Sequence, residues 1–443
     1  MKVRESKPPS PWSPGHHLLR GTAFVFLAEA LFPLTGIVTA AFLTRRLGAE
    51  SYGILTLTAT LISWIEVAIG AFFAQATVKV IGDAEDWRPA GTAVLRLQSC
   101  VGLGAMAAVW VLAKPVALLL GEPGLAGCLA LYAIDIPLNA WTHCHRNLLV
   151  GRGKYVERAT VGAGRWIARL VLILVLVGLG FSLTGALAAL LGASVVELAI
   201  ARYHIRPAWS RKTGVPVTLW GYAVPTFLAS MSLRLMNVDL FLLKSLGASA
   251  AVAGIYGASQ NVAFIMPGVF AVSFSPLLLS TILRVRRDED AEAARTLGRN
   301  AVRLVLCAIP VASVAAAASD EIAVLLFGAH FRDAGPLMSV LVFAGLAMMT
   351  IALMNSVLIA WGKPSWPIRI AAPLLPLAIA GHLLAIPRFG PLGAAWVTAI
   401  VTGLGGLAGL IAVLRLLGTG FPAVTLARAL LLSGLAAAAA FFW

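Results

Sequence analysis

Charged residues are scarce in this sequence, and acidic residues are scarcer than basic ones. Only 12% of the 443 residues are charged, with 19 Asp and Glu against 34 Lys and Arg, whereas an average soluble domain is roughly 25% charged. Hydrophobic residues make up 60% of the chain, and the mean hydropathy is +0.90. This composition excludes a disordered chain and argues against a soluble multidomain enzyme. The net charge of +15 is therefore assigned to one face of a membrane, and no nucleic-acid partner is expected.

Cysteine is rare, with four residues in the chain and no CxxC pair. All four lie in apolar stretches, which is typical of small buried thiols and excludes a disulfide framework. The polar, Pro-rich start up to His17 lacks the short apolar core of a cleavable signal peptide. The apolar run after Arg20 is long enough to span a bilayer, so we expect it to be retained as the first helix.

Motifs for metal and nucleotide binding are also missing. His143 and His145 flank Cys144, but at i and i+2 on a helix their imidazoles point about 200° apart. The run VGRGKY (150–155) has neither the spacing nor the Ser/Thr of a P-loop. We therefore expect no metal, no cofactor and no catalytic residue.

Long apolar runs predict an all-α polytopic membrane protein with twelve core transmembrane helices. A further run, 424–443, is either a thirteenth span or a helix on the membrane surface. The expected core spans are 21–43, 53–74, 92–113, 126–149, 161–180, 183–203, 218–243, 252–279, 301–319, 336–360, 367–386 and 392–415.

The basic residues lie almost entirely in alternate loops. About 27 of the 34 Lys and Arg residues fall in the N-terminal tail and in the loops on the same side of the membrane. The positive-inside rule places the N-terminus and these loops in the cytoplasm. The basic segment 284–303 is interpreted either as an amphipathic helix lying near anionic lipid headgroups or as an ordinary solvated helix in a loop.

An internal repeat follows the first and the seventh expected helices. The segments RRLGAESYGILTLTAT (45–60) and KSLGASAAVAGIYGAS (244–259) share a basic residue, a Leu-Gly pair, and a Gly and Tyr that open the next helix. Their Leu-Gly pairs are 199 residues apart, which corresponds to six helices. We therefore expect two six-helix lobes related by a pseudo-two-fold axis along the membrane normal. The predicted division is a tail (1–20), an N-lobe (21–212), a C-lobe (213–415) and an extra helix (416–443).

With four short motifs, the chain resembles a polysaccharide flippase of the MOP superfamily, which also contains multidrug exporters and the lipid II flippase. The motifs are Arg46-Leu47-Gly48…Tyr52-Gly53, Asp239…Leu246-Gly247…Gly254-Ile255-Tyr256, Leu325-Leu326-Phe327-Gly328 and Phe389-Gly390-Pro391-Leu392-Gly393-Ala394-Ala395. The resemblance implies a V-shaped transporter in the bacterial inner membrane, with two lobes around a central cavity. It further implies that the protein flips an undecaprenyl-diphosphate-linked oligosaccharide from the cytoplasmic to the outer leaflet. It also implies surface polysaccharide assembly, such as O-antigen, as the pathway. The expected partners are this lipid-linked oligosaccharide, anionic membrane lipids and either H⁺ or Na⁺.

Ionisable residues inside the expected spans are the candidate site residues, because a charge in the bilayer is costly and usually faces a cavity, a partner or water. Arg234, in the outer half of the seventh span, stands about 140° around the helix from Asp239 and needs a partner elsewhere. A diphosphate fits its guanidinium fork, and a structural salt bridge to Asp135 is the alternative. The candidates for substrate binding are Arg234, Asn237 and Arg46. The candidates for ion coupling are Glu29, Glu66, Asp135 and Asp239.

Arginines near the cytoplasmic ends of the spans receive a simpler interpretation. Arg96, Arg165 and Arg169 are expected to snorkel to the membrane interface.

Two alternative functions stay open: an ion-coupled multidrug or small-molecule exporter, and a membrane enzyme of glycan assembly. An exporter of cations needs an acidic and aromatic cavity, whereas Arg234 and the arginine-rich inner mouth favour an anionic substrate. An enzyme of that kind carries a large outer loop, and the longest outer loop here runs only from Asp320 to Gly335.

Overall fold

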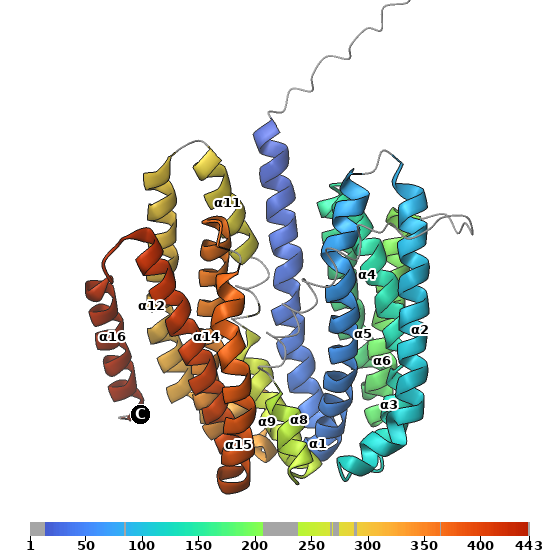
Figure 1. Ribbon diagram of the computed structural model, residues 1–443. Coiled ribbons are helices and arrows are strands. Elements are labelled where there is room, and N and C mark those ends of the chain that lie inside the picture. Colours follow the sequence, from blue (N-terminus) through green and yellow to red (C-terminus); the bar gives the residue numbers. More distant parts are fainter. Residues whose placement is uncertain are drawn as a thin grey trace, which may run out of the picture.

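The computed structural model describes residues 14–83, 86–206, 238–265, 268, 274–287, 290–363 and 365–441, and in some helices the backbone alone. Throughout these ranges the regular structure is helical, and no strand occurs in them (Figure 1). Within these ranges, eight helical segments are long and apolar enough to cross a membrane, with residues 125–151 counted as one segment. Two of the eight are bent in the middle and account for two expected spans each. The expected all-α, multi-pass architecture is confirmed, while the count of twelve spans and the symmetry axis stay predictions.

Helices α1 to α6 form what we call the N-terminal bundle. Its members are α1 (Pro14–Asp83), α2 (Trp87–Leu119), α3 (Leu125–Tyr132), α4 (Asp135–Gly151), α5 (Tyr155–Gly178) and α6 (Ser182–His204). Helix α1 contains the expected spans 21–43 and 53–74 as two arms that meet at Gly48, where φ is 73° and ψ is 174°. Only glycine adopts such a conformation without steric cost, so Gly48 ends one arm and starts the next.

Helices α8 to α16 form what we call the C-terminal bundle. Its members are α8 (Asp239–Ser245), α9 (Ala250–Ala263), α11 (Ser275–Arg287), α12 (Ala291–Ala317), α13 (Ser319–Phe327), the 3₁₀ turn η2 (Ala329–Phe331), α14 (Ala334–Ala360), α15 (Trp366–Leu417) and α16 (Ala423–Phe441). Helix α15 is bent at Gly390 (φ 57°, ψ −141°). Its two arms pack against each other, because a Cβ on Gly381 would lie 2.8 Å from Cγ1 of Val397.

The two bundles meet at one end of the molecule, and α1 and α9 are in contact there. From this end the bundles diverge toward the end where α1 begins (Figure 1). The predicted boundary between lobes, 212/213, lies outside the described residues, as does most of the expected seventh span. The final run forms α16, which packs against α12.

The basic segment 284–303 differs from its first interpretation. Residues up to Arg287 end α11, and from Ala291 the chain belongs to α12, which continues without interruption into the expected span 301–319. A helix confined to the membrane surface or to a loop was therefore the wrong expectation for residues 291–303, while the proximity of this segment to anionic headgroups stays a prediction. Asp290 caps α12, with its Oδ1 accepting a hydrogen bond from the Ala293 backbone N–H at 2.8 Å. This cap starts the spanning helix about ten residues earlier than hydropathy alone suggested.

Candidate functional site

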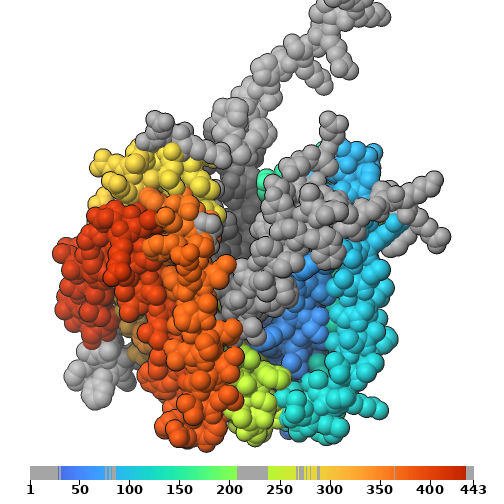
Figure 2. Space-filling model, viewed as in Figure 1, coloured from blue at the N-terminus to red at the C-terminus, as the bar shows by residue number. Residues whose placement is uncertain are grey.

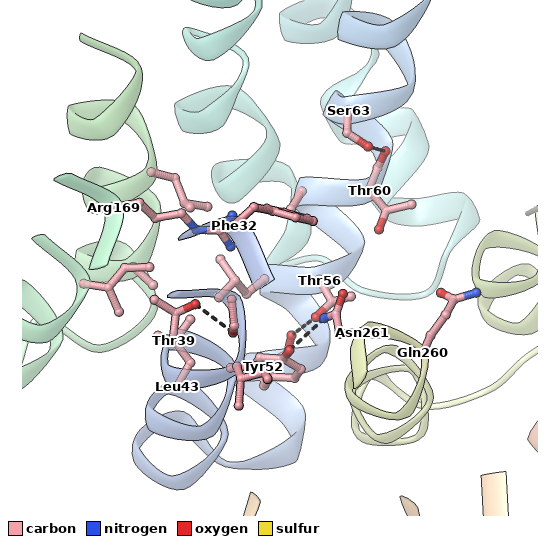
Figure 3. Close-up of a pocket in the computed structure, with 18 of the residues that line it drawn as sticks. Phe32, Thr39, Leu43, Tyr52, Thr56, Thr60, Ser63, Arg169, Gln260 and Asn261 are labelled. Atoms are coloured by element: carbon pink, nitrogen blue, oxygen red, sulfur yellow. Dashed lines mark hydrogen bonds between the residues drawn. The ribbon is translucent and has the colours of Figure 1, made fainter. Parts of the chain in front are cut away.

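A cavity of about 430 Å³ lies between the two bundles. Both arms of α1 contribute to its wall, together with α5, α6, the end of α3 and the end of α9. Figure 3 shows Arg169 on one side of this cavity and Gln260 and Asn261 on the opposite side. The polar and charged lining residues are Thr39, Tyr52, Thr56, Thr60, Ser63, Glu66, Tyr132, Arg165, Arg169, Gln260 and Asn261.

Many of the hydroxyl groups in the wall are satisfied within their own helix. Thr39 donates to the Thr35 carbonyl at 2.7 Å, and Thr56 donates to the Tyr52 carbonyl at 2.8 Å. Such back-bonding removes the cost of placing a hydroxyl in an apolar span while leaving its lone pairs available. Across the cavity, Asn261 Nδ2 donates to the Tyr52 hydroxyl at 3.0 Å. This hydrogen bond joins α9 to α1.

Arg169 is a cation in the wall without a fixed counter-charge. It extends from α5 toward the cavity near Phe32 (Figure 3). Within the described residues it makes no ion pair or hydrogen bond, and its buried Nε has no partner. Its electrostatic neighbours are Tyr52, Tyr132, Arg165 and the carboxyl group of Asp135, and none of them forms an ion pair with it. Its charge is therefore available to an anion inside the cavity.

Arg165 lines the same cavity one turn earlier on α5, and it has a partner. Its Nη1 lies 2.8 Å from Oε2 of Glu197, which is almost fully buried, and Arg146 Nη1 lies 3.2 Å from the other oxygen of Glu197. The expectation that Arg165 and Arg169 snorkel to the interface is therefore wrong. The physical reason is the i, i+4 spacing, which puts both side chains on the face of α5 that the cavity occupies.

Glu66 and Asp135 were predicted separately from the sequence, and the structure brings them together. Glu66 lines the cavity from the second arm of α1, and its carboxyl group contacts that of Asp135, at the start of α4. Asp135 is fully buried next to Tyr132 and Ser194. Neither of its oxygens has a well-formed hydrogen bond to a described donor, and the same holds for Oε1 of Glu66. Two carboxyl groups in contact require a shared proton or a cation between them.

Asp239 lies in the C-terminal bundle, behind the opposite wall. Its carboxylate accepts hydrogen bonds from the Tyr256 hydroxyl at 2.7 Å, the Thr398 hydroxyl at 2.9 Å and Gln260 Nε2 at 3.0 Å. Gln260 itself lines the cavity, so it connects Asp239 to the central space. His382 is buried and interacts electrostatically with Asp239. Neither of its ring nitrogens has a hydrogen-bond partner among the described residues.

The remaining predicted site residues are outside this cavity or outside the described part of the chain. Arg46 is exposed at the bend of α1, with its guanidinium 5.9 Å from the centre of the Phe42 ring, and it is not in the cavity wall. The backbone of Glu29 belongs to α1, but its side chain lies outside the description. Arg234 and Asn237 lie outside the described residues altogether.

Comparison of the sequence with known proteins identifies a family and a relative. Residues 42–336 match the family described as "Polysaccharide biosynthesis protein". The succinoglycan biosynthesis transport protein ExoT of Rhizobium meliloti (strain 1021) is 24% identical over 308 residues. That alignment covers 69% of this chain and 61% of the relative, so the chain matches less than two thirds of that protein's length.

Solved transporters share the architecture. The lipid II flippase MurJ in an inward closed conformation has a TM-score of 0.71 at 13% identity, over 94% of this chain and 91% of that chain. An inward-facing multidrug resistance MATE transporter of the MOP superfamily has a TM-score of 0.65 at 14% identity, over 89% and 94%. The eukaryotic MATE transporter AtDTX14 has a TM-score of 0.66 at 13% identity, over 95% and 99%. These likenesses confirm the predicted transporter fold, and the family match confirms the predicted resemblance to polysaccharide biosynthesis proteins.

Proposed function

We propose a transport function for this chain, which belongs to the family of polysaccharide biosynthesis proteins. In this proposal it moves a lipid-linked oligosaccharide across a membrane by alternating access. The substrate is an oligosaccharide attached to undecaprenyl diphosphate, which moves from the cytoplasmic to the outer leaflet of a bacterial inner membrane. The cavity between the bundles receives the diphosphate and the sugars, while the lipid tail stays in the bilayer.

The position of Arg169 is the main observation that supports this proposal. This arginine offers a positive charge inside a cavity between two bundles, and it forms no ion pair with any described residue. An arginine presents a planar fork of N–H donors that matches phosphate oxygens bidentately. A substrate diphosphate would supply the missing anion. On the opposite wall, Gln260 and Asn261 provide amide groups suited to hydrogen-bonding with sugar hydroxyls.

The orientation follows from the distribution of basic residues. The positive-inside rule assigns the N-terminal end of α1 to the cytoplasm, and the bundles diverge toward this end (Figure 1). In this orientation the cavity accepts substrate from the cytoplasm, and the contact between α1 and α9 closes the outer end. Arg234 and Asn237 remain proposed substrate contacts on the basis of their sequence positions alone.

Ion coupling is assigned to the pair Glu66 and Asp135. Both carboxyl groups adjoin the wall that carries Arg165 and Arg169, so the number of protons they hold changes the charge presented to an anionic substrate. A sodium ion between the two groups is the alternative coupling ion. Asp239 is a second candidate on the other side of the cavity, linked to it through Gln260.

A multidrug exporter is the second candidate function, because the fold is shared with MATE transporters. The two functions differ in the charge of the substrate. A cationic drug would be repelled by Arg169, whereas a diphosphate would be stabilised there. The two substrates therefore predict opposite effects of removing this one positive charge.

The test is transport of an undecaprenyl-diphosphate oligosaccharide in proteoliposomes by Arg169→Ala, Arg169→Lys and the control Arg202→Ala, an exposed arginine on α6. A charge-assisted hydrogen bond contributes about 1.5–3 kcal/mol, so Arg169→Ala should lose about tenfold to a hundredfold in transport. Arg169→Lys should retain an intermediate rate, and the control should be unchanged. Wild-type transport of the lipid-linked substrate by folded Arg169→Ala would refute the proposal. A simultaneous gain in the export of cationic dyes would favour the multidrug function.

A further inference from the structure

A smaller hollow lies at the junction of α12, α15 and the segment that leads to α16. It shares no lining residue with the central cavity. Its volume is about 140 Å³, and its wall includes Arg299, Arg303, Thr419, Val302, Leu414 and Pro422. In Figure 1 the end of α15 and the start of α16 lie at the same end of the molecule as the start of α12. This is the end that the basic residues assign to the cytoplasm.

The local sequence explains how the hollow forms. Gly418 adopts a left-handed conformation (φ 62°) after the last turn of α15 and lets the chain turn toward α16. Gly298 of α12 allows close packing here, because a Cβ on it would lie 2.8 Å from Cδ1 of Leu417. Arg299 and Arg303 are one turn apart, so they project from the same face of α12 into the same space.

The charges in the hollow are not compensated by the described residues. Arg299 donates one hydrogen bond, from Nη2 to the Thr296 hydroxyl at 3.2 Å. In the described part of the chain, neither arginine has a carboxylate within salt-bridge distance. The hydroxyl oxygen of Thr419 is buried and has no hydrogen-bond partner among the described residues. Two guanidinium groups without an ion pair and a buried hydroxyl without a hydrogen bond therefore line one small space among the described residues.

An apolar surface adjoins these donors. Val302, Leu414 and Pro422 complete the wall. Immediately beyond it, Phe421 is 44% exposed and Val424 66% exposed, and the leucines of α16 continue this apolar face. A free phosphate ion would match the arginines alone. A molecule with a phosphate group and hydrocarbon chains would match both the donors and the adjoining face.

We propose that this hollow binds the phosphate of an anionic phospholipid in the leaflet on the N-terminal side of the membrane. Arg299 and Arg303 bind the phosphodiester oxygens, and the Thr419 hydroxyl donates a third hydrogen bond. The acyl chains lie along Phe421 and α16. Basic pockets between transmembrane helices on the cytoplasmic side are suited to such headgroups. The bound lipid links α12 to the segment between α15 and α16, and its binding is independent of the transport function proposed above.

The experiment measures lipid binding to the full-length protein in a neutral detergent. Phosphatidylglycerol, phosphatidylcholine or inorganic phosphate is added, and retained lipids are counted by native mass spectrometry alongside thermal unfolding. The test variant is Arg299→Gln with Arg303→Gln. The matched control is Arg295→Gln with Arg415→Gln, which removes the same charge from two exposed arginines outside the hollow.

We expect the wild type and the control to retain one phosphatidylglycerol and to gain several degrees in unfolding temperature, and the test variant to lose both effects. Thr419→Val should weaken retention several-fold without changing the net charge, and it provides the test if the double variant fails to fold. Equal retention by the test variant and the control would overturn the proposal, because the binding would then depend on general surface charge. Equal stabilisation by inorganic phosphate or phosphatidylcholine would overturn it as well.

Discussion

Gly53 of α1 and Gly254 of α9 face each other where the two bundles cross. A Cβ on Gly53 would overlap the backbone of Ala250, and a Cβ on Gly254 would overlap the carbonyl oxygen of Ala49 and lie 2.8 Å from the Gly53 nitrogen. The contact is reciprocal, because each glycine meets the alanine four residues before the other. Small residues at this spacing allow two membrane helices to approach closely. The crossing therefore depends on the absence of side chains at two positions.

Gly53→Ala should force the crossing apart. Overpacking of a tight contact costs about 1–3 kcal/mol, which favours conformations in which the bundles separate at this end. We expect lower transport and faster labelling of a cysteine placed at Ala59, in the cavity wall, by an impermeant thiol reagent added from outside. The control is Gly104→Ala in α2, where a Cβ would meet no atom within 4 Å. Unchanged labelling in Gly53→Ala would show that the crossing does not close the cavity.

The sequence was sufficient to predict this end of the fold. The repeated Leu-Gly pairs indicated matching turns, and Gly48 and Gly247 both adopt a positive φ, 73° and 102°. Local motifs of this kind are recoverable because the requirement for glycine is set by the backbone of one residue. Gly390, in the fourth of the motifs that carry the resemblance, also marks a bend with positive φ, 57°.

The same loops join the bundles through a pair of basic residues. Arg45 Nε donates to the Leu326 carbonyl at 3.1 Å, and its Nη2 donates to the Leu325 carbonyl. Lys244, the corresponding residue of the second repeat, lies 2.8 Å from Oε1 of Glu122 in the N-terminal bundle. Each repeat thus reaches across to the other bundle, through a carbonyl acceptor in one case and a carboxylate in the other.

Glu122→Ala should destabilise the protein through Lys244. Lys244 is only 5% exposed, and Glu122 also accepts a hydrogen bond from the Ala250 N–H at 3.2 Å. Removing one partner of a largely buried pair leaves an uncompensated charge, and we expect a loss of about 1–3 kcal/mol. The double variant Glu122→Ala with Lys244→Met should recover most of that loss in thermal unfolding. If the losses of the two single variants simply add, the pair is not coupled and the prediction is wrong.

The cavity itself was harder to predict. Arg165 and Arg169 stand near the end of an expected span, where hydropathy favours snorkelling, and the spacing alone does not say whether their shared face meets lipid or another helix. The i, i+4 arrangement was the available signal. Gln260 and Asn261 carried no comparable signal, because their exposure to the cavity depends on how two distant bundles are placed. Glu66 and Asp135 were found individually because any carboxylate within a span is conspicuous, but their contact depends on packing between α1 and α4.

Glu66→Gln and Asp135→Asn should remove the pH dependence of substrate binding. The charged and titratable groups around this pair are Tyr132 from α3, Arg165 and Arg169 from α5, and Glu197 from α6. When the pair loses a proton, a negative charge is added near the two arginines and weakens their attraction for an anion. In the wild type, affinity for undecaprenyl diphosphate should therefore fall as the pH rises. Either variant keeps one group permanently neutral and should keep the high affinity found at low pH.

Binding across a pH series, measured with purified protein, distinguishes this role from a structural one. Glu197→Gln is the informative comparison, because Glu197 pairs with Arg146 and Arg165, and its loss should reduce stability while leaving the slope of affinity against pH in place. Repeating the series with and without sodium separates the two coupling ions, since a sodium site would show a salt requirement that both carboxyl variants abolish. If Glu66→Gln and Asp135→Asn both keep the wild-type slope of affinity against pH and the wild-type response to sodium, the pair belongs only to the packing between α1 and α4. The coupling group then lies elsewhere, and Asp239 is the next candidate.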